Sequence, residues 1–168
     1  MDRSRHEPVV AGLLAVALFA GACGARPAAR RPPSLSALKL DVLAAVGGRL
    51  DYCDPDLYPV AHGTPLSNAR RRLPIIRADR AAYQAILAHL HVVPGTRLSD
   101  QELIAIDEDY KQIQAIKLVA SPGGYRFTVY VPAIASPTRN ESISGFIATT
   151  GKIRLRPPGP GRLKRCPI

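Results

Sequence analysis

Tryptophan is absent from this 168-residue chain, aromatic residues make up 5% of it, and it contains only three cysteines and one methionine. Several short ligand-binding and catalytic motifs are also missing. There is no G-x-x-x-x-G-K-[ST] or G-x-G-x-x-G loop for a nucleotide, no G-x-S-x-G and no H-E-x-x-H. There is no C-x-x-C pair of the kind found in zinc sites and redox proteins. The sequence therefore predicts neither a metal nor a cofactor.

Acidic residues are scarce. The chain has 13 Asp and Glu against 23 Lys and Arg, which gives a formal net charge of +10. Such an excess attracts polyanions wherever it is concentrated on a surface. With 46% hydrophobic and 21% charged residues, the composition is that of a globular protein, and the length is that of one ordinary domain.

The N-terminal apolar run is too short to span a membrane. It extends from Val9 to Ala22, fourteen residues, whereas a spanning helix needs about 20. Arg3 and Arg5 precede it and small residues lie at its end, as is typical of a secretory signal peptide. We therefore expect residues 1–22 to be a signal peptide.

The end of this run, Ala20-Gly21-Ala22-Cys23, resembles the lipobox of bacterial lipoproteins. The resemblance covers residues 1–23 only. It implies that Cys23 becomes the first mature residue and carries a diacylglyceryl group. The protein would then be exported and anchored by its lipid on the outer side of the cytoplasmic membrane or in the cell envelope. The same residues fit an ordinary A-x-A cleavage site, so plain secretion and an uncleaved anchor are the alternatives.

A segment rich in proline and arginine follows, and we expect residues 23–33 to be a tether. Arg26, Arg30 and Arg31 lie near the expected lipid, where each base contributes roughly 1 kcal/mol at an anionic membrane surface. Lipid and basic residues would together form a two-signal membrane anchor. The alternative is a solvated spacer.

The two remaining cysteines form an even pair if Cys23 carries a lipid. In an exported, oxidising compartment we expect Cys53 and Cys166 to form a disulfide. This bond would tie the loop after the first helix to the C-terminus. The chain-entropy model values such a closure at roughly 4–5 kcal/mol.

Residues 34–168 are predicted to form a single α+β domain, with helices in the first half and strands in the second. The expected helix N-caps are Ser34, Thr64, Asp79 and Ser99. We expect the second helix to end before Pro74. The fourth is expected to bury Ile106 and Ile113, while its charged residues fall largely outside the apolar stripe.

After the fourth helix the apolar period changes to two. Lys117–Ser121 and Tyr125–Val131 are predicted to form a hairpin around a Ser-Pro-Gly-Gly turn. A second hairpin is predicted from Ser142–Thr149 and Lys152–Arg156, followed by an irregular tail. The expected sheet is a meander of three or four antiparallel strands covered by the preceding helices.

The densest group of reactive side chains lies between the first two predicted helices and includes Asp54, Asp56 and His62. As a metal site it is weak, because the ligand spacing of known sites is missing. As the centre of a small hydrolase it would need carboxylates with raised pKa values in a cleft. The favoured interpretation is a structural loop pinned by the disulfide.

Basic residues alternate along the last predicted strand. Lys152, Arg154 and Arg156 are separated by apolar residues, so their side chains should project from one strand face. Three more bases follow: Arg162, Lys164 and Arg165. Residues 152–165 contain no acid and residues 100–109 contain no base, so we expect a polarised domain.

A basic strip of this kind can bind an anionic envelope polymer, lipid headgroups or an acidic protein. Specific binding of nucleic acid is not expected, because the chain is predicted to be exported and no aromatic residues interleave with the bases. The alternative is a solvated face that protects an edge strand. The sequence thus favours a non-catalytic binding or structural module of the cell envelope, with a small hydrolase-like enzyme as the alternative. It predicts no oligomeric state.

Overall fold

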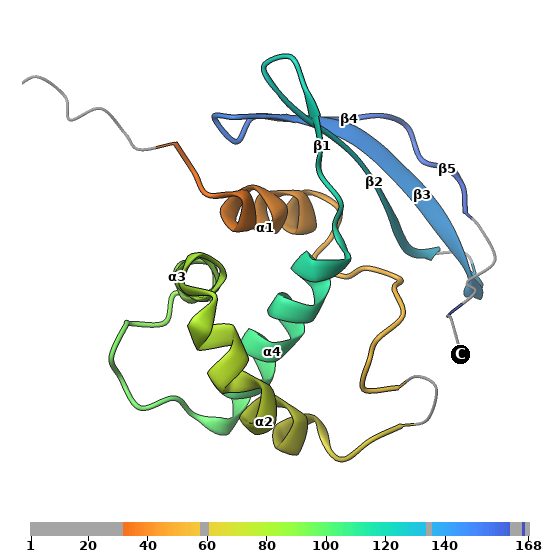
Figure 1. Ribbon diagram of the computed structural model, residues 1–168. Coiled ribbons are helices and arrows are strands. Elements are labelled where there is room, and N and C mark those ends of the chain that lie inside the picture. The colour runs from red at the N-terminus through yellow and green to blue at the C-terminus, as the bar shows by residue number, and fades with distance from the viewer. Residues whose placement is uncertain (1–31, 58–60, 134–135, 162–165, 167–168) are drawn as a thin grey trace, which may run out of the picture. The chain divides into compact units, whose positions relative to one another are not determined.

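The computed structural model describes residues 32–57, 61–133, 136–161 and 166, which belong to one compact unit (Figure 1). The predicted signal peptide, Cys23 and nearly all of the tether lie outside these residues. So do the three C-terminal bases Arg162, Lys164 and Arg165.

Within the described residues four helices precede the strands, which confirms the predicted α+β class. They are α1 (Leu35–Ala45), α2 (Pro65–Ala78), α3 (Arg80–His89) and α4 (Asp100–Ala115). Each begins after its predicted cap, whose side chain accepts a hydrogen bond from a backbone N–H of the first turn. At Thr64 and Ser99 the bond is reciprocal, because Ser67 and Glu102 accept from the backbone N–H of the cap residue. Local side-chain chemistry therefore sets where the helices start.

The prediction that the second helix ends before Pro74 is wrong. Helix α2 continues through Pro74 to Ala78. An interior proline forfeits one helical hydrogen bond and costs about 3 kcal/mol. Continuation places Ile76 in the core, where it is 0% exposed, and ends the helix at Asp79, which caps α3. Burial of Ile76 offsets part of the proline penalty.

The strands form an antiparallel sheet in the order β1-β2-β3-β4, with β5 also paired to β3. They are β1 (Val119–Ser121), β2 (Gly124–Ala133), β3 (Ser136–Ala148), β4 (Ile153–Leu155) and β5 (Gly159–Pro160). The turn between β1 and β2 has Gly123 at φ +78°, as predicted for a type II turn. Strand β3 begins earlier than predicted, and the tail expected to be irregular contributes β5, because both segments find pairing partners.

The core lies between the helices and one face of the sheet, and Figure 1 shows the helices together on that side. From the sheet, Phe127, Val129 and Val131 point inward and are at most 8% exposed, as the alternation predicts. The fully buried residues include Val42 of α1, Ile86 of α3, Ile106 of α4 and Ile147 of β3. Every layer therefore contributes to one shared core.

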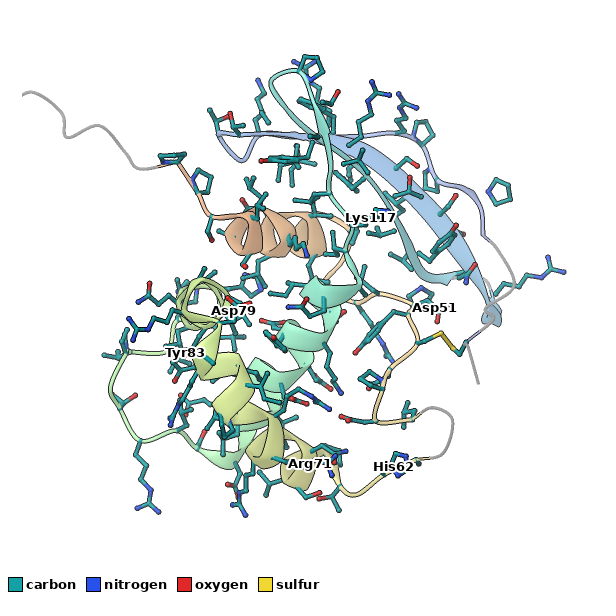
Figure 2. All side chains as sticks on the ribbon, in the orientation of Figure 1. Asp51, His62, Arg71, Asp79, Tyr83 and Lys117 are labelled. Carbon is teal, nitrogen blue, oxygen red and sulfur yellow. A yellow bond between two sulfur atoms is a disulfide. The ribbon has the colours of Figure 1, made fainter. Side chains whose placement is uncertain are left out.

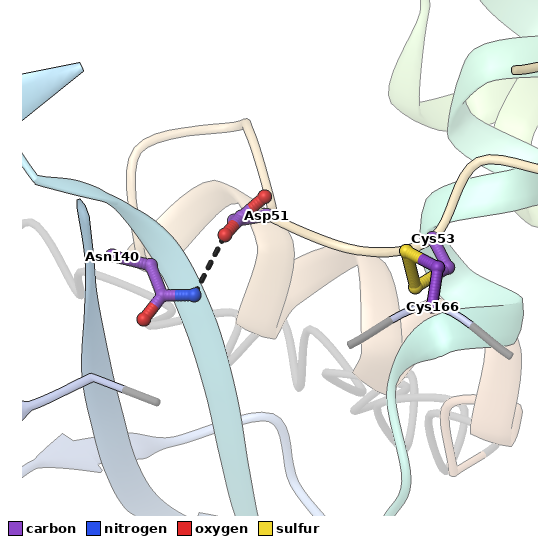
Figure 3. The surroundings of a disulfide bond; sticks show 4 residues. All are labelled: Asp51, Cys53, Asn140 and Cys166. Atoms are coloured by element: carbon purple, nitrogen blue, oxygen red, sulfur yellow. Dashed lines mark hydrogen bonds between the residues drawn. A yellow bond between two sulfur atoms is a disulfide. The ribbon is translucent and has the colours of Figure 1, made fainter. Parts of the chain in front are cut away.

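The loop after α1 is held between α4 and the sheet. The Leu50 N–H donates to Oε1 of Gln112 at 2.9 Å, and the Asp51 N–H donates to the Tyr130 carbonyl at 2.8 Å. Farther along, Cys53 forms the predicted disulfide with Cys166, 113 residues away (Figure 3). These contacts position the acidic loop that follows.

Candidate functional site

The acidic loop folds over α2 and α4 into a buried cluster of opposite charges. The Lys111 Nζ lies 3.0 Å from Asp54 Oδ2, 2.9 Å from Asp56 Oδ2 and 3.7 Å from Asp107 Oδ2. The Arg72 guanidinium donates to both oxygens of Asp107, at 2.5 and 2.6 Å, and also to Asp56. The five side chains are only 4–21% exposed. We call this group the charge cluster.

The cations of the charge cluster keep the buried Asp56 carboxylate ionised. Burial alone would raise the pKa of Asp56, but hydrogen bonds and charges from Arg72 and Lys111 outweigh it, so that pKa is lowered. Burial would likewise lower the pKa of Lys111, yet its bonds to Asp56 and Asp54 raise it. Burial and the nearby Asp54 also raise the pKa of Tyr52. The electrostatics thus favour a closed structural network.

His62 does not join the two aspartates with which the sequence grouped it. Its imidazole is exposed on the loop before α2 (Figure 2). Only its backbone is tied down: the His62 N–H donates to the Asp56 carbonyl at 2.9 Å, and Asn68 Nδ2 donates to the His62 carbonyl at 2.6 Å. A hydrolase using Asp56 as an acid would need a raised pKa, and the pKa of Asp56 is shifted the other way.

Two acidic residues of α4 are buried, contrary to the prediction that they lie outside its apolar stripe. Asp107 and Asp109 are 3% and 8% exposed. Helix α4 packs against α1, α2 and α3, so more than one of its faces is covered. Asp107 belongs to the charge cluster, whereas Asp109 Oδ2 lies 4.0 Å from Nε2 of His89 and has no hydrogen-bond partner among the described residues. Burial raises the pKa of Asp109.

The other acidic residues at the start of α4 also have local partners. Asp100 pairs with Arg70 at 2.9 Å, and Glu102 accepts from the Ser99 N–H at 2.7 Å. Three of the five acids in residues 100–109, namely Asp100, Glu102 and Asp107, are therefore bound to partners within the fold. The expected polarisation of the domain rests mainly on its basic side.

Arg154 of β4 and the two bases that flank this strand, Lys152 and Arg156, lie on the sheet face opposite the core. Arg154 pairs across the sheet with Phe146, which pairs with Arg126. Because cross-strand partners share a face, and because Phe127 and Ile147 point into the core, these three side chains point outward. The Ala148 N–H donates to the Lys152 carbonyl, and the Arg156 N–H to the Ser144 carbonyl, so both bases continue the outward row. We call the group Arg126, Phe146, Lys152, Arg154 and Arg156 the basic sheet face.

The cations of this face are exposed and have no ion pair with any described residue. No strand residue that the register places on the face is acidic. Glu141 pairs with the inward-facing Val131. The side chain of Asp51 accepts a hydrogen bond from Asn140 (Figure 3). Asn140 pairs with Pro132, six residues along β2 from Arg126, so this carboxylate lies far from Arg126. The basic sheet face thus differs from the charge cluster, where each cation is neutralised.

Sequence reasoning missed the cations of the charge cluster and two members of the basic sheet face. Lys111 lies more than fifty residues from the acidic loop. Arg72 lies on the helix that follows the loop, 16 residues from Asp56, but no local pattern marks either cation as a partner of the aspartates. Arg126 was visible as an outward residue in an alternating strand. The strand register that brings Phe146 between Arg126 and Arg154 carried no sequence signal.

The fold and both groups define an α+β domain with a neutralised interior cluster and an open basic sheet face. No protein-family model, curated protein or solved structure matches the chain. Among the described residues, no three His, Cys, Asp or Glu side chains are arranged to hold a metal ion. In the charge cluster, the Lys111 ammonium stands between the three carboxylates.

None of the helices in the described ranges combines the length and apolar character required to cross a bilayer.

Proposed function

We propose that this protein is an exported, lipid-anchored module of the cell envelope that binds an anionic partner through its basic sheet face. The observation that carries the proposal is the contrast between two sets of cations. Arg72 and Lys111 are paired with buried carboxylates, whereas Arg126, Arg154 and Arg156 are exposed and have no described acidic partner. Unpaired cations gathered on one face attract and hold polyanions.

The same contrast supports a non-catalytic role. The carboxylates that could have served a hydrolase, Asp54 and Asp56, are bound by cations, and the His62 side chain is exposed. A general acid or base must have a free proton-transfer site near the reacting atom. The acidic loop instead has a structural role, and the proposed anion-binding surface is the basic sheet face.

Export and lipid attachment rest on the signal-like segment 1–22 and on Cys23. The test is to express the full chain in a bacterium and to measure the mass of the membrane-extracted protein. We expect cleavage before Cys23 and an added diacylglyceryl mass, both lost in Cys23→Ser. A mature chain without lipid that is found in the medium would contradict the anchor.

The anion-binding role is tested with the full chain carrying Cys23→Ser, titrated with inorganic polyphosphate over a series of salt concentrations. Binding that releases counterions weakens linearly on a log–log plot against salt. We expect the triple variant Lys152→Gln, Arg154→Gln and Arg156→Gln to flatten that slope and to lose most of the affinity.

A matched triple variant removes the same charge elsewhere. Arg49, Arg80 and Arg97 are exposed and have no ion pair with a described residue. Their replacement by Gln should leave most of the affinity intact. Equal losses in the two triple variants, or binding that does not respond to salt, would refute the proposal.

A further inference from the structure

The basic sheet face contains an aromatic ring flanked by two arginines. Across the sheet the row reads Val119, Arg126, Phe146, Arg154. Strands β2 and β4 flank β3, and neighbouring strands are about 4.8 Å apart, so the two arginine backbones are roughly 10 Å apart. A ligand that spans them must cross the Phe146 ring.

The Phe146 ring lies along the sheet. A Cβ placed on Gly124 of the neighbouring strand would come within 2.8 Å of Phe146 Cζ. The ring tip therefore covers Gly124, and the side chain is half-buried. The half-buried ring is therefore held on the outer face of the sheet, on the strand between those that carry Arg126 and Arg154.

Hydroxyl groups occupy the next rows of the same face. Thr128 pairs with Ser144, and their hydroxyl oxygens are 3.0 Å apart. Tyr130 pairs with Ser142, whose hydroxyl donates to the Pro160 carbonyl at 3.1 Å. Each hydroxyl retains capacity to accept or donate a further hydrogen bond. The face thus combines cations, one aromatic ring and two cross-strand rows of hydroxyl groups.

We propose that the anionic partner is an acidic polysaccharide whose sugar rings carry carboxylates, a conclusion that rests on the proposed function above. Guanidinium groups pair with carboxylates in a planar, bidentate geometry, which suits Arg126 and Arg154. The apolar C–H face of a sugar ring packs on Phe146 between them, and sugar hydroxyls bond to the Thr128 and Ser144 row. Each chemical feature of an acidic sugar has a counterpart on this face.

Other occupants match fewer of these features. A bare phosphate polymer offers nothing to cover the Phe146 ring. Insertion into lipid needs several protruding apolar side chains. Phe146 lies across Gly124, and in its row only Val119, which is 53% exposed, protrudes. Two copies of the chain would place basic faces against each other. Single-stranded nucleic acid stacks successive bases on several rings, whereas Tyr130 lies two rows from Phe146, roughly 14 Å along the strands.

The test compares ligands that differ in one feature at a time, using the full chain with Cys23→Ser. The probes are oligogalacturonate, its methyl ester, inorganic polyphosphate, a single-stranded oligothymidylate and vesicles of phosphatidylglycerol. We expect oligogalacturonate to bind more tightly than the other probes at equal charge concentration. Its uncharged ester should bind at least roughly tenfold more weakly, since it lacks the charged acceptors that the arginines bind.

Two variants test the contributions of the Phe146 ring and of the arginine charges separately. Phe146→Leu keeps an apolar cover over Gly124 but removes the ring, and we expect it to weaken oligogalacturonate binding roughly fivefold while leaving polyphosphate binding unchanged. Arg126→Gln with Arg154→Gln should weaken both ligands, and Arg97→Gln neither. If Phe146→Leu fails to fold, Thr128→Val provides a second test, because it removes one hydroxyl and keeps the side-chain shape.

The outcomes distinguish this inference from the function on which it rests. Polyphosphate binding as tight as that of oligogalacturonate, with no effect of Phe146→Leu, would overturn the polysaccharide and leave anion binding in place. Tighter binding of oligothymidylate or vesicles would also overturn it. Absence of salt-dependent binding to every anionic probe would overturn both proposals.

Discussion

Replacing Lys111 by methionine removes the ammonium that three carboxylates share in the charge cluster. Methionine keeps most of the apolar length of the side chain, so the change mainly removes charge. Arg72, which contacts Asp56 and Asp107, is then the one remaining cation of the cluster, and Asp54 loses its cation. The variant tests whether the cluster is a structural network.

The expected cost follows from burial. Removing one partner of a buried ion pair costs about 3–5 kcal/mol, because the other charge stays buried without compensation. Lys111 is 9% exposed and Asp107 is 4% exposed. Arg72 still forms ion pairs with Asp56 and Asp107. Asp54, which loses its partner, is 21% exposed and is the carboxylate of the cluster most accessible to water. We therefore expect a loss near the lower end, about 3 kcal/mol.

The pH dependence has a defined sign. The pKa of Asp56 is lowered in the folded state, so its stabilisation is present above the ordinary value of about 3.9 and is lost as pH falls through the folded value. The pKa of Lys111 is raised, so its stabilisation is complete below about 10.4 and is lost as pH rises through the folded value. In Lys111→Met the alkaline loss should disappear, and the acid loss due to Asp56 should become smaller, because the folded pKa of Asp56 moves back toward its ordinary value.

The assay is urea unfolding of the oxidised protein from about pH 2 to about pH 12, followed by circular dichroism, so that the range covers both losses. Lys117→Met is the matched control, because Lys117 is exposed (Figure 2), and it should change the free energy of unfolding by less than about 0.5 kcal/mol. Adding Asp54→Asn to Lys111→Met should recover part of the loss, since it removes one uncompensated charge. A cost for Lys111→Met equal to that of Lys117→Met would refute the reasoning.

Three further predictions concern other parts of the fold. Removing the disulfide with Cys53→Ser and Cys166→Ser should lower the free energy of unfolding by up to about 4–5 kcal/mol, and two free thiols found by alkylation of the non-reduced wild-type protein would show that the bond is absent. Pro74→Ala should raise the free energy of unfolding by about 1–2 kcal/mol, because it restores a helical N–H within α2. A lower midpoint of thermal unfolding in this variant than in the wild-type protein would contradict the prediction. Because burial raises the pKa of Asp109, the carboxylate weakens the fold when ionised. Asp109→Asn should therefore be more stable than the wild-type protein at pH 7, and this difference should disappear in acid, where Asp109 of the wild-type protein is protonated. If the difference in the free energy of unfolding does not change with pH, Asp109 does not have a raised pKa.

The helix starts and the first hairpin could be predicted because their causes are local. Ser99 and Glu102 lie three residues apart and satisfy each other's backbone N–H groups. Gly123 supplies the positive φ that the turn requires. Interactions over a few residues fix such features whatever the rest of the chain does.

Pro74 and Asp109 show where local rules fail. A proline normally ends a helix, and an aspartate outside the apolar stripe of a helix normally faces water. In this fold, α2 continues because Ile76 is buried beyond Pro74, and Asp109 is buried because α4 packs against three other helices. Packing across the domain outweighed the local preference in both places.

By itself, the sequence determined the α+β class, the capped helices, the strand alternation and the choice of Cys53 and Cys166 as the disulfide pair. Only the tertiary structure decided which charges are neutralised and which stay open. It brought Lys111 to Asp54 and Asp56 across more than fifty residues, and it aligned Arg126, Phe146 and Arg154 in one row of the sheet. The physical reason is that ion pairing and strand register depend on contacts between distant segments, and these exist only once the chain has folded.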